Sequence, residues 1–229
     1  MSKVQPVLAV VRALNILNAF RPNEQSLTLQ ELSVRTGLYK STLLRQLQTL
    51  ISEHCVTRLE NGEYQLGARV LQWAHAYTSS LNLEQHVPPT LNRLVKLTGE
   101  GASFFVRDGD MRVCLYRADS KKELRDHIQQ GELLPLKRGA AGKILLYFSD
   151  IKETEKKPET FVSIGEREEE IAAISAAVFG AAGLKGAIAL SGPATRFTES
   201  NILKWRNIVF DEAKKLSLIL GGERFYYEK

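Results

Sequence analysis

The first 67 residues show the hydrophobic pattern of three helices followed by a hairpin. Residues 6–20 carry apolar side chains at the spacing of a helix that buries one face. These side chains are Val7, Val10, Val11, Leu14 and Leu17. Thr28 and Glu31 then have the spacing of a capping box, in which each side chain accepts a hydrogen bond from a free amide at a helix start. This second helix ends at Gly37, because a residue without a Cβ atom easily adopts the left-handed conformation of a helix end.

A third predicted helix, residues 39–52, separates an apolar face from a polar one at about 100° per residue. The apolar face holds Leu43, Leu44, Leu47, Leu50 and Ile51, and the polar face holds Ser41, Thr42, Arg45, Gln48 and Thr49, with Gln46 at the boundary and Lys40 in the first turn. Residues 33–52 contain no acidic side chain, so we expect Arg35, Lys40 and Arg45 to carry uncompensated charge. Arginine and glutamine can read guanine and adenine in the major groove, and serine and threonine can bind phosphates or bases.

A hairpin is predicted after this helix. Residues 56–59 and 63–66 flank Asn61-Gly62, a dipeptide that favours a two-residue turn with positive φ at both positions. Helix, capped helix, tight turn, polar-faced helix and hairpin, in that order, indicate a winged helix-turn-helix. The candidate DNA contacts are Thr28, Lys40, Ser41, Thr42, Arg45, Gln46, Arg58 and Asn61. The competing interpretation is a solvated helix face followed by an ordinary turn.

The rest of the chain indicates a connecting helix and an α+β domain. The connecting helix, residues 68–81, has Val70, Leu71, Ala74 and Tyr77 along one side. Further helices are expected at 87–97, 140–148 and 198–220, and strands near 104–106, 112–116, 161–164, 171–179 and 186–191. We expect these strands to form a sheet with helices on one side. The predicted divisions are residues 1–67 for a DNA-binding domain, 68–82 for a linker helix and 83–229 for a second domain.

Composition and charge narrow the class of protein. The 229 residues are 44% hydrophobic and 25% charged, which predicts a packed globular core. The net charge of +5 permits a nucleic-acid partner without requiring one. The sequence lacks an apolar run of membrane-spanning length and a signal-peptide pattern, which predicts a cytoplasmic protein with no membrane partner. Cys55 and Cys114 lie far apart without metal-ligand spacing, so neither a disulfide, a metal site nor a cofactor is expected.

Two features of the second domain raise the question of chemistry. Residues 139–143 resemble part of a phosphate-binding loop, but Lys137 and Ile144 stand where that loop needs a glycine and a hydroxyl. Small residues at a helix start can still hold an anion, although tight helix packing explains them equally well. Cys114 could act as a nucleophile if a histidine lay beside it in the fold. The alternative function is therefore an enzyme or metabolite-binding protein whose winged helix docks a protein partner.

Short motifs follow one another in a definite order along nearly the whole chain. They are Ala13–Leu17, Leu29–Leu32, Thr36–Thr42, Tyr64–Gly67, Thr98–Glu100, Leu134–Leu136, Ala141–Lys143 and Leu190–Pro193, with Arg196 close behind. This order across two domains resembles the IclR family of bacterial transcriptional regulators. The resemblance implies a GAF-like α/β effector domain that binds a small, often acidic metabolite, and homodimers or tetramers on palindromic double-stranded DNA operators.

The resemblance also implies where the effector would bind. The matching positions are Ala140, Ala141, Gly142, Ser163, Ala173, Ala189 and Ser191. Ala173 and Ala189 stand where some members of the family have polar groups, and residues 149–160 form a shorter segment than is usual there. We therefore expect a ligand-responsive regulator, a repressor, that reads DNA through residues 39–52 and has a cavity with few hydrogen-bonding side chains.

Overall fold

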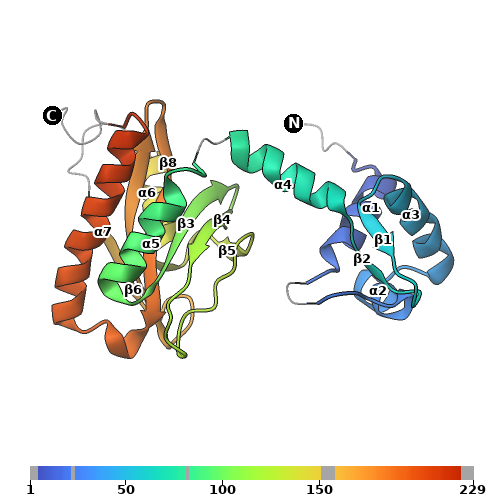
Figure 1. The fold of residues 1–229 in the computed structure, drawn as a ribbon, viewed down its shortest axis with the longest axis horizontal. Coiled ribbons are helices and arrows are strands. Elements are labelled where there is room, and N and C mark those ends of the chain that lie inside the picture. Colours follow the sequence, from blue (N-terminus) through green and yellow to red (C-terminus); the bar gives the residue numbers. More distant parts are fainter. Residues whose placement is uncertain (1–4, 22–23, 81–82, 151–157, 223–229) are drawn as a thin grey trace. The chain divides into compact units, whose positions relative to one another are not determined.

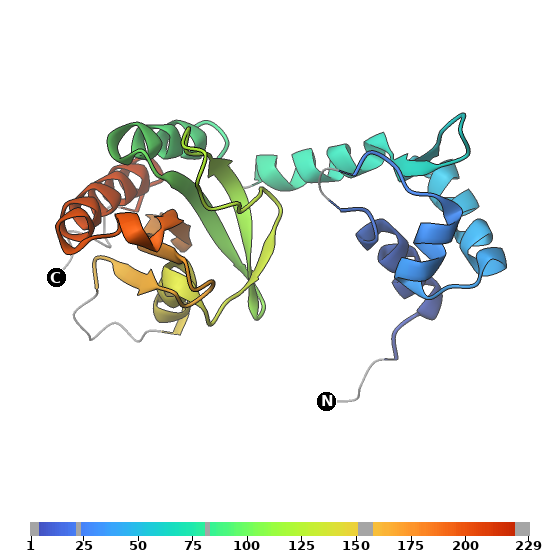
Figure 2. The ribbon, with the colours of Figure 1, turned by 90° about the horizontal axis from the view of Figure 1, so that it is seen from below.

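The computed structural model describes residues 5–21, 24–80, 83–150 and 158–222. The chain divides into two compact units, which are described separately: the first comprises residues 1–82 and the second residues 83–229 (Figures 1 and 2). The predicted polar segment before Glu159 lies largely outside the described residues.

The first unit is a winged helix-turn-helix with one further helix. Its elements are α1 (Leu8–Asn18), α2 (Leu29–Thr36), α3 (Lys40–Ser52), β1 (Val56–Arg58), β2 (Tyr64–Leu66) and α4 (Ala68–Ser80). Strands β1 and β2 pair in antiparallel fashion. A bridge between Leu27 and Tyr64, with both hydrogen bonds at 2.8 Å, joins β2 to the residue before the α2 cap. The core beneath consists mainly of Ile16, Leu27, Leu32, Leu43, Leu47, Leu50, Val56 and Tyr64.

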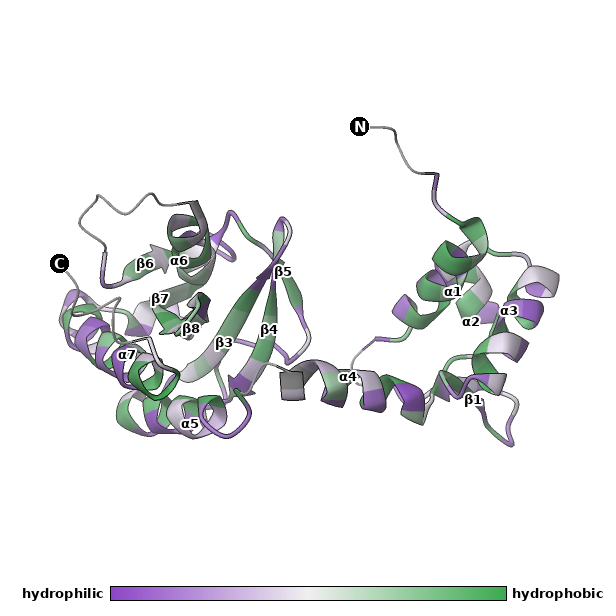
Figure 3. Cartoon of the chain, turned by 90° about the horizontal axis from the view of Figure 1, so that it is seen from above, coloured by the Kyte–Doolittle hydropathy of each residue, from purple (hydrophilic) through white to green (hydrophobic). Residues whose placement is uncertain are grey.

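The apolar face predicted for α1 was assigned wrongly. Val7 is 66% exposed, Val10 56% and Leu14 53%, whereas Ile16 is fully buried. Figure 3 shows that much of α1 is hydrophobic, and the residues of this helix form two apolar stripes. Helical spacing alone cannot decide which stripe faces the core. Leu17 does pack against the core, but Leu44 of α3, which was also expected inside, is 42% exposed.

The turn of the hairpin also differs from the prediction. Gly62 has a φ of +85°, whereas Asn61 is not among the residues with positive φ. The Leu59 N–H donates to the Glu63 carbonyl at 2.8 Å and the Gly62 N–H to the Leu59 carbonyl at 3.0 Å. The connection is therefore a three-residue loop with a left-handed glycine, another common hairpin solution. Both the predicted two-residue turn and the observed three-residue loop need a residue with positive φ at the position of Gly62. The Asn61-Gly62 dipeptide therefore could not distinguish between them.

The second unit is built on a six-stranded antiparallel sheet. Its elements are α5 (Val87–Thr98), β3 (Gly101–Asp108), β4 (Met111–Ala118), β5 (Leu133–Pro135), α6 (Gly139–Asp150), β6 (Phe161–Ile164), β7 (Ile171–Gly180), β8 (Gly183–Pro193), a 3₁₀ turn (Ala194–Arg196) and α7 (Glu199–Ile219). The strand order is β5-β4-β3-β8-β7-β6. Strand β5 is only three residues long, which explains why the sequence pattern missed it.

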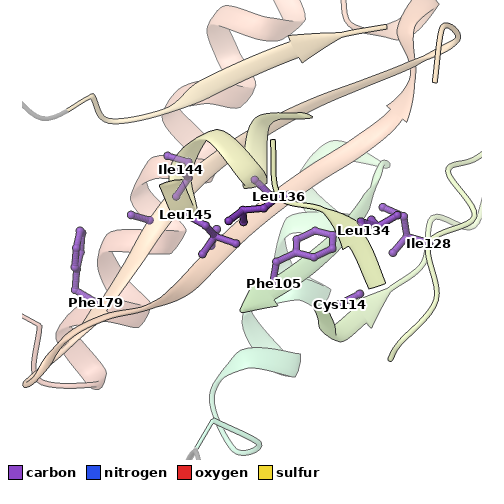
Figure 4. Close-up of a cluster of buried hydrophobic side chains, with 12 residues drawn as sticks. Phe105, Cys114, Ile128, Leu134, Leu136, Ile144, Leu145 and Phe179 are labelled. Carbon is purple, nitrogen blue, oxygen red and sulfur yellow. The ribbon is translucent and has the colours of Figure 1, made fainter. Parts of the chain in front are cut away.

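Helices cover both faces of this sheet, so the expectation of helices on one side was wrong. Helices α5 and α7 pack together against one face, and α6 packs against the other (Figure 3). The cluster under α6 includes Phe105, Ile144, Leu145 and Ala189. Figure 4 shows Phe105 beside Leu134 and Ile128 at one end of this cluster. The strand residues that line it alternate with residues facing α5 and α7, and this layering brings the start of α6 over the middle of the sheet.

Candidate nucleic-acid interface and ligand cavity

The outer side of α3 carries the polar residues predicted for it. Lys40, Ser41 and Arg45 are exposed, and Thr42 and Gln46 are half-buried at its edges. The side chains of Lys40 and Arg45 form no hydrogen bond or ion pair with any described residue, so both charges are available to a partner. Tyr39, at the helix start, is 85% exposed and was not predicted to be a contact.

Arg35 does not contribute the free charge expected of it. Its guanidinium binds Glu24 through two hydrogen bonds of 2.5 and 2.9 Å and also donates to the Ala19 carbonyl at 2.8 Å. The hydrogen bond from Arg35 lowers the pKa of the Glu24 carboxyl. The partner lies outside the acid-free segment, so a count confined to residues 33–52 could not detect it. Lys40 and Arg45 remain as the unpaired cations of that segment.

The side chain of Thr28 caps the start of α2. Its hydroxyl accepts from the Glu31 N–H at 3.2 Å and donates to the Glu31 carboxylate at 2.8 Å, while that carboxylate accepts from the Thr28 N–H. The capping box is thus formed as predicted. Because the hydroxyl proton of Thr28 is already engaged, this residue has less to offer DNA than the residues of α3.

The wing places one cation and one amide at the surface. Arg58 is exposed, with its guanidinium carbon 5.8 Å from the centre of the Tyr64 ring. Asn61 lies at the tip, where its side-chain oxygen accepts from the Glu63 N–H at 3.0 Å. A hydrogen bond from Ser26 to Glu63 links the hairpin to the segment before α2. The wing is therefore fixed in place beside the helices it flanks.

In the second unit, a cavity lies at the start of α6. The space open to the centre of a water molecule inside it is about 30 Å³. It is lined by Phe105, Arg112, Asp126, Ile128, Gly139, Ala140, Ala141, Ser163, Arg167, Ile171, Ala173, Ala189 and Ser191. The structure thus brings together six of the seven residues that the resemblance implied. Gly142 is the exception, since a Cβ atom there would lie 1.9 Å from the Leu136 carbonyl oxygen, and its smallness serves packing.

The first amides of α6 already have partners inside the protein. The Gly139 N–H donates to the Glu166 carboxylate at 3.3 Å, and the Ala140 N–H donates to the Ser163 hydroxyl at 3.0 Å. Glu166 also pairs with Lys143. On the opposite wall, the Ser191 hydroxyl accepts from Arg117 at 3.3 Å. The hydrogen-bonding groups expected to meet a ligand are thus partly engaged by side chains.

Three charged residues in the cavity were missed by the sequence reasoning. Arg112 is 3% exposed and donates to the Arg138 carbonyl at 2.6 Å and to the Pro135 carbonyl. Burial, with a smaller effect from Arg167, lowers the pKa of Arg112 to about 10, so it remains a cation at neutral pH. Asp126 is 2% exposed and binds Arg167 at 2.5 Å. The available signal was the strand pattern, because Arg112 lies two residues before Cys114 and therefore on the same face of β4.

Cys114 lacks the properties of a nucleophile. Its side chain is fully buried, and burial raises the pKa of the thiol to about 11. The thiolate that such chemistry needs is therefore scarce at neutral pH. Among the described residues, no group of histidine, cysteine, aspartate and glutamate could hold a metal ion. No helix in the described ranges is long and apolar enough to cross a membrane.

Comparisons with known proteins agree with this architecture. The family model described as the IclR helix-turn-helix domain matches residues 9–60, and the one described as the C-terminal part of the bacterial transcriptional regulator IclR matches residues 75–164. The transcriptional regulator XynR of Escherichia coli is 30% identical over 61% of this chain and 56% of its own length. The transcriptional repressor AllR of Salmonella typhi is 26% identical over 93% of this chain and 90% of its own.

The solved structures show the same fold. An IclR homologue from Microbacterium hydrocarbonoxydans, crystallised with 4-hydroxybenzoate, superposes with a TM-score of 0.77 at 16% identity, over 93% of this chain and 98% of that one. The buried thiol with a raised pKa argues against the alternative in which Cys114 is a nucleophile, and the matched family models and curated relatives are those of transcription regulators. The protein is a transcription regulator with a helix-turn-helix domain and a C-terminal α/β domain, and the chain belongs to the IclR family.

Proposed function

We propose that this protein is a repressor that binds a palindromic operator through α3 and releases or tightens its hold when a small metabolite occupies the cavity. The observation that carries the DNA contact is the pair of exposed, unpaired cations on α3, Lys40 and Arg45. Ser41, Thr42 and Gln46 accompany them on that helix, and Arg58 and Asn61 reach the backbone or the minor groove from the wing. Thr28 completes the proposed set, at the start of α2.

The exposed stripe of α1 supports a homodimer. Val7, Val10 and Leu14 are each more than half exposed, which is unfavourable for apolar side chains that no other element covers. A second copy of the chain would cover them through a two-fold interface. Such a dimer presents two copies of α3 to half-sites about one helical turn apart, which matches a palindromic operator.

The cavity supports regulation by a small molecule. The Microbacterium homologue was crystallised with 4-hydroxybenzoate, so a protein of this fold can bind a small molecule, and this chain has a cavity at the start of α6. We assign residues 1–67 to DNA binding, 68–82 to a linker helix and 83–229 to effector binding. An effector changes operator affinity only if it binds one arrangement of the dimer better than another, typically by about 1–3 kcal/mol. We place this activity in the cytoplasm.

Footprinting on genomic DNA, followed by mobility-shift titrations at several salt concentrations, tests the proposal. We expect a protected palindrome and an affinity that falls steeply with salt, because phosphate contacts release counterions. Lys40→Gln should reduce the slope of log affinity against log salt by about one. Lys204→Ala, which removes an exposed cation from the second unit, should leave the slope unchanged. A salt-independent affinity would contradict the proposed DNA interface.

A further inference from the structure

Two buried polar atoms in the cavity lining have no hydrogen-bond partner among the described residues. They are Nε of Arg112 and Oδ2 of Asp126. Both residues line the cavity, and both are at least nine-tenths buried. Unsatisfied polar atoms in a protein interior are rare and costly in free energy, and each one calls for an explanation. A ligand that supplies both missing partners would explain the pair.

Arg112 presents the edge of its guanidinium that suits a carboxylate. The two backbone carbonyls it binds are both reached through Nη1, so Nε and Nη2 remain without a partner in the described chain. Nη2 lies 3.5 Å from the point that a Cβ atom on the cavity residue Gly139 would occupy. Adjacent Nε and Nη groups are the fork that grips a carboxylate with two parallel hydrogen bonds. No ion pair involving Arg112 occurs within the described residues.

Asp126 has the opposite requirement. Its Oδ1 accepts from Arg167, while its Oδ2 needs a donor. The cavity therefore contains two guanidinium groups and one carboxylate, a net charge of +1. An anionic ligand neutralises that charge, and a hydroxyl group on the same ligand can donate to Oδ2.

The start of α6 is a weaker anchor for an anion than Arg112. Its Gly139 and Ala140 amides are taken by Glu166 and Ser163. A ligand carboxylate would have to displace another carboxylate to reach the Gly139 N–H. The free edge of Arg112 involves no such competition.

We propose that Arg112 and Asp126 hold the effector, with Arg112 binding the carboxylate of a small hydroxy acid and Asp126 accepting a hydrogen bond from its hydroxyl group. This inference rests on the proposed effector function and specifies its ligand. The alanine methyls of Ala173 and Ala189 leave an apolar space for the carbon skeleton. Arg112 is accordingly a specificity-determining residue that contacts the ligand.

Three probes with the same three-carbon skeleton test this assignment on the full-length protein. Sodium propanoate offers only the carboxylate, propane-1,2-diol only hydroxyl groups, and sodium lactate both. Calorimetric titration at constant ionic strength should give lactate about tenfold tighter binding than propanoate, the usual effect of one added hydrogen bond. The diol should not bind measurably. Equal affinities for lactate and the diol, or no binding of any probe at 50 mM, would overturn the proposal.

Variants distinguish the loss of the proposed Arg112 contact from a general loss of structure. Arg112→Gln should weaken lactate binding about 10- to 100-fold, since it removes a charged fork from the site. Arg112→Lys keeps the charge and should bind lactate with an affinity between those of Arg112→Gln and the wild type. It replaces the glutamine variant in this test if that variant does not fold. Arg107→Gln makes the same change at an exposed position of β3 outside the cavity lining and should bind lactate normally. Unchanged lactate binding by folded Arg112→Gln would remove Arg112 from the site.

Operator binding distinguishes the failure of this inference from the failure of the proposed function. Without added acid, Arg112→Gln should bind the footprinted operator with wild-type affinity, because α3 is unchanged. Normal operator binding with no response to the probes would reject the ligand class alone. Lactate binding by a protein that binds no operator would reject the DNA interface and leave the ligand class standing.

Discussion

Arginine occurs in two contrasting settings, on the surface of α3 and inside the cavity of the second unit. Arg45 is exposed and water can solvate its charge, so the absence of an internal partner carries little cost. Arg112 is 3% exposed and no carboxylate binds it among the described residues. Two backbone carbonyls and the Phe105 ring contact its guanidinium, but a buried cation without an anionic partner is still expensive to maintain. An arginine without an anionic partner is therefore ordinary on the surface of α3, whereas inside the cavity it indicates a ligand.

The largest expected effect concerns Gly142 of α6, which packs closely against the backbone of Leu136. Gly142→Ala should destabilise the second unit by about 3 kcal/mol, because the new methyl group would meet backbone at Leu136 in a packed interior. Chemical denaturation of the full-length variant measures this loss. As a control, Gly131→Ala places a methyl group in open space at a φ of +86° and should cost only about 1 kcal/mol. Equal losses would show that packing at Gly142 is not the constraint.

A second prediction addresses the exposed stripe of α1. Leu14→Glu should lower operator affinity about 100-fold if a second copy covers this stripe, since each half-site would then bind separately. Sedimentation measurements should show the matching loss of dimer. Arg12→Glu, on the same helix, changes charge without removing an apolar side chain from the stripe. A larger effect of Arg12→Glu on the dimer would argue for an interface elsewhere.

Arg45 provides the next test, on the surface itself. Arg45→Ala should weaken operator binding by about 1–3 kcal/mol and relax the preference at one base pair. Mobility shifts with operators substituted at each position measure both effects. An equal loss on unrelated DNA would reduce Arg45 to a phosphate contact.

The smallest effect is expected at Ser191. Ser191→Ala should change the response to effector by about 1 kcal/mol, the usual net value of one hydrogen bond, and leave operator binding without effector unchanged. Its hydroxyl accepts from Arg117 in this structure, so part of the effect would pass through that arginine. A normal response to an active effector would remove Ser191 from the site.

Local patterns predicted the features that local forces determine. The capping box at Thr28, the left-handed Gly37 and the polar face of α3 all follow from residues within a few positions of each other. Features set by distant residues could not be obtained this way. Glu24 neutralises Arg35 across eleven positions, and the buried face of α1 depends on what α2 and α3 supply beneath it.

The cavity shows the same division. Its small residues were located through the family resemblance, and the structure brings all but Gly142 to its lining. Arg112, Asp126 and Arg167 come from three separate segments, and their approach depends on the sheet order. Nothing near Arg112 in the sequence distinguishes it from an exposed strand arginine except its alternation with Cys114. The charge of a cavity therefore depends on the tertiary structure and cannot be obtained from local sequence patterns.

The two hydrogen bonds between Leu27 and Tyr64 have a consequence for how DNA is read. They join the wing to the start of α2, so wing and helices meet the double helix as one rigid body. Because a rigid domain cannot change its shape to fit the groove, the DNA must deform instead. We therefore expect easily deformed base-pair steps to be favoured at operator positions that no side chain touches.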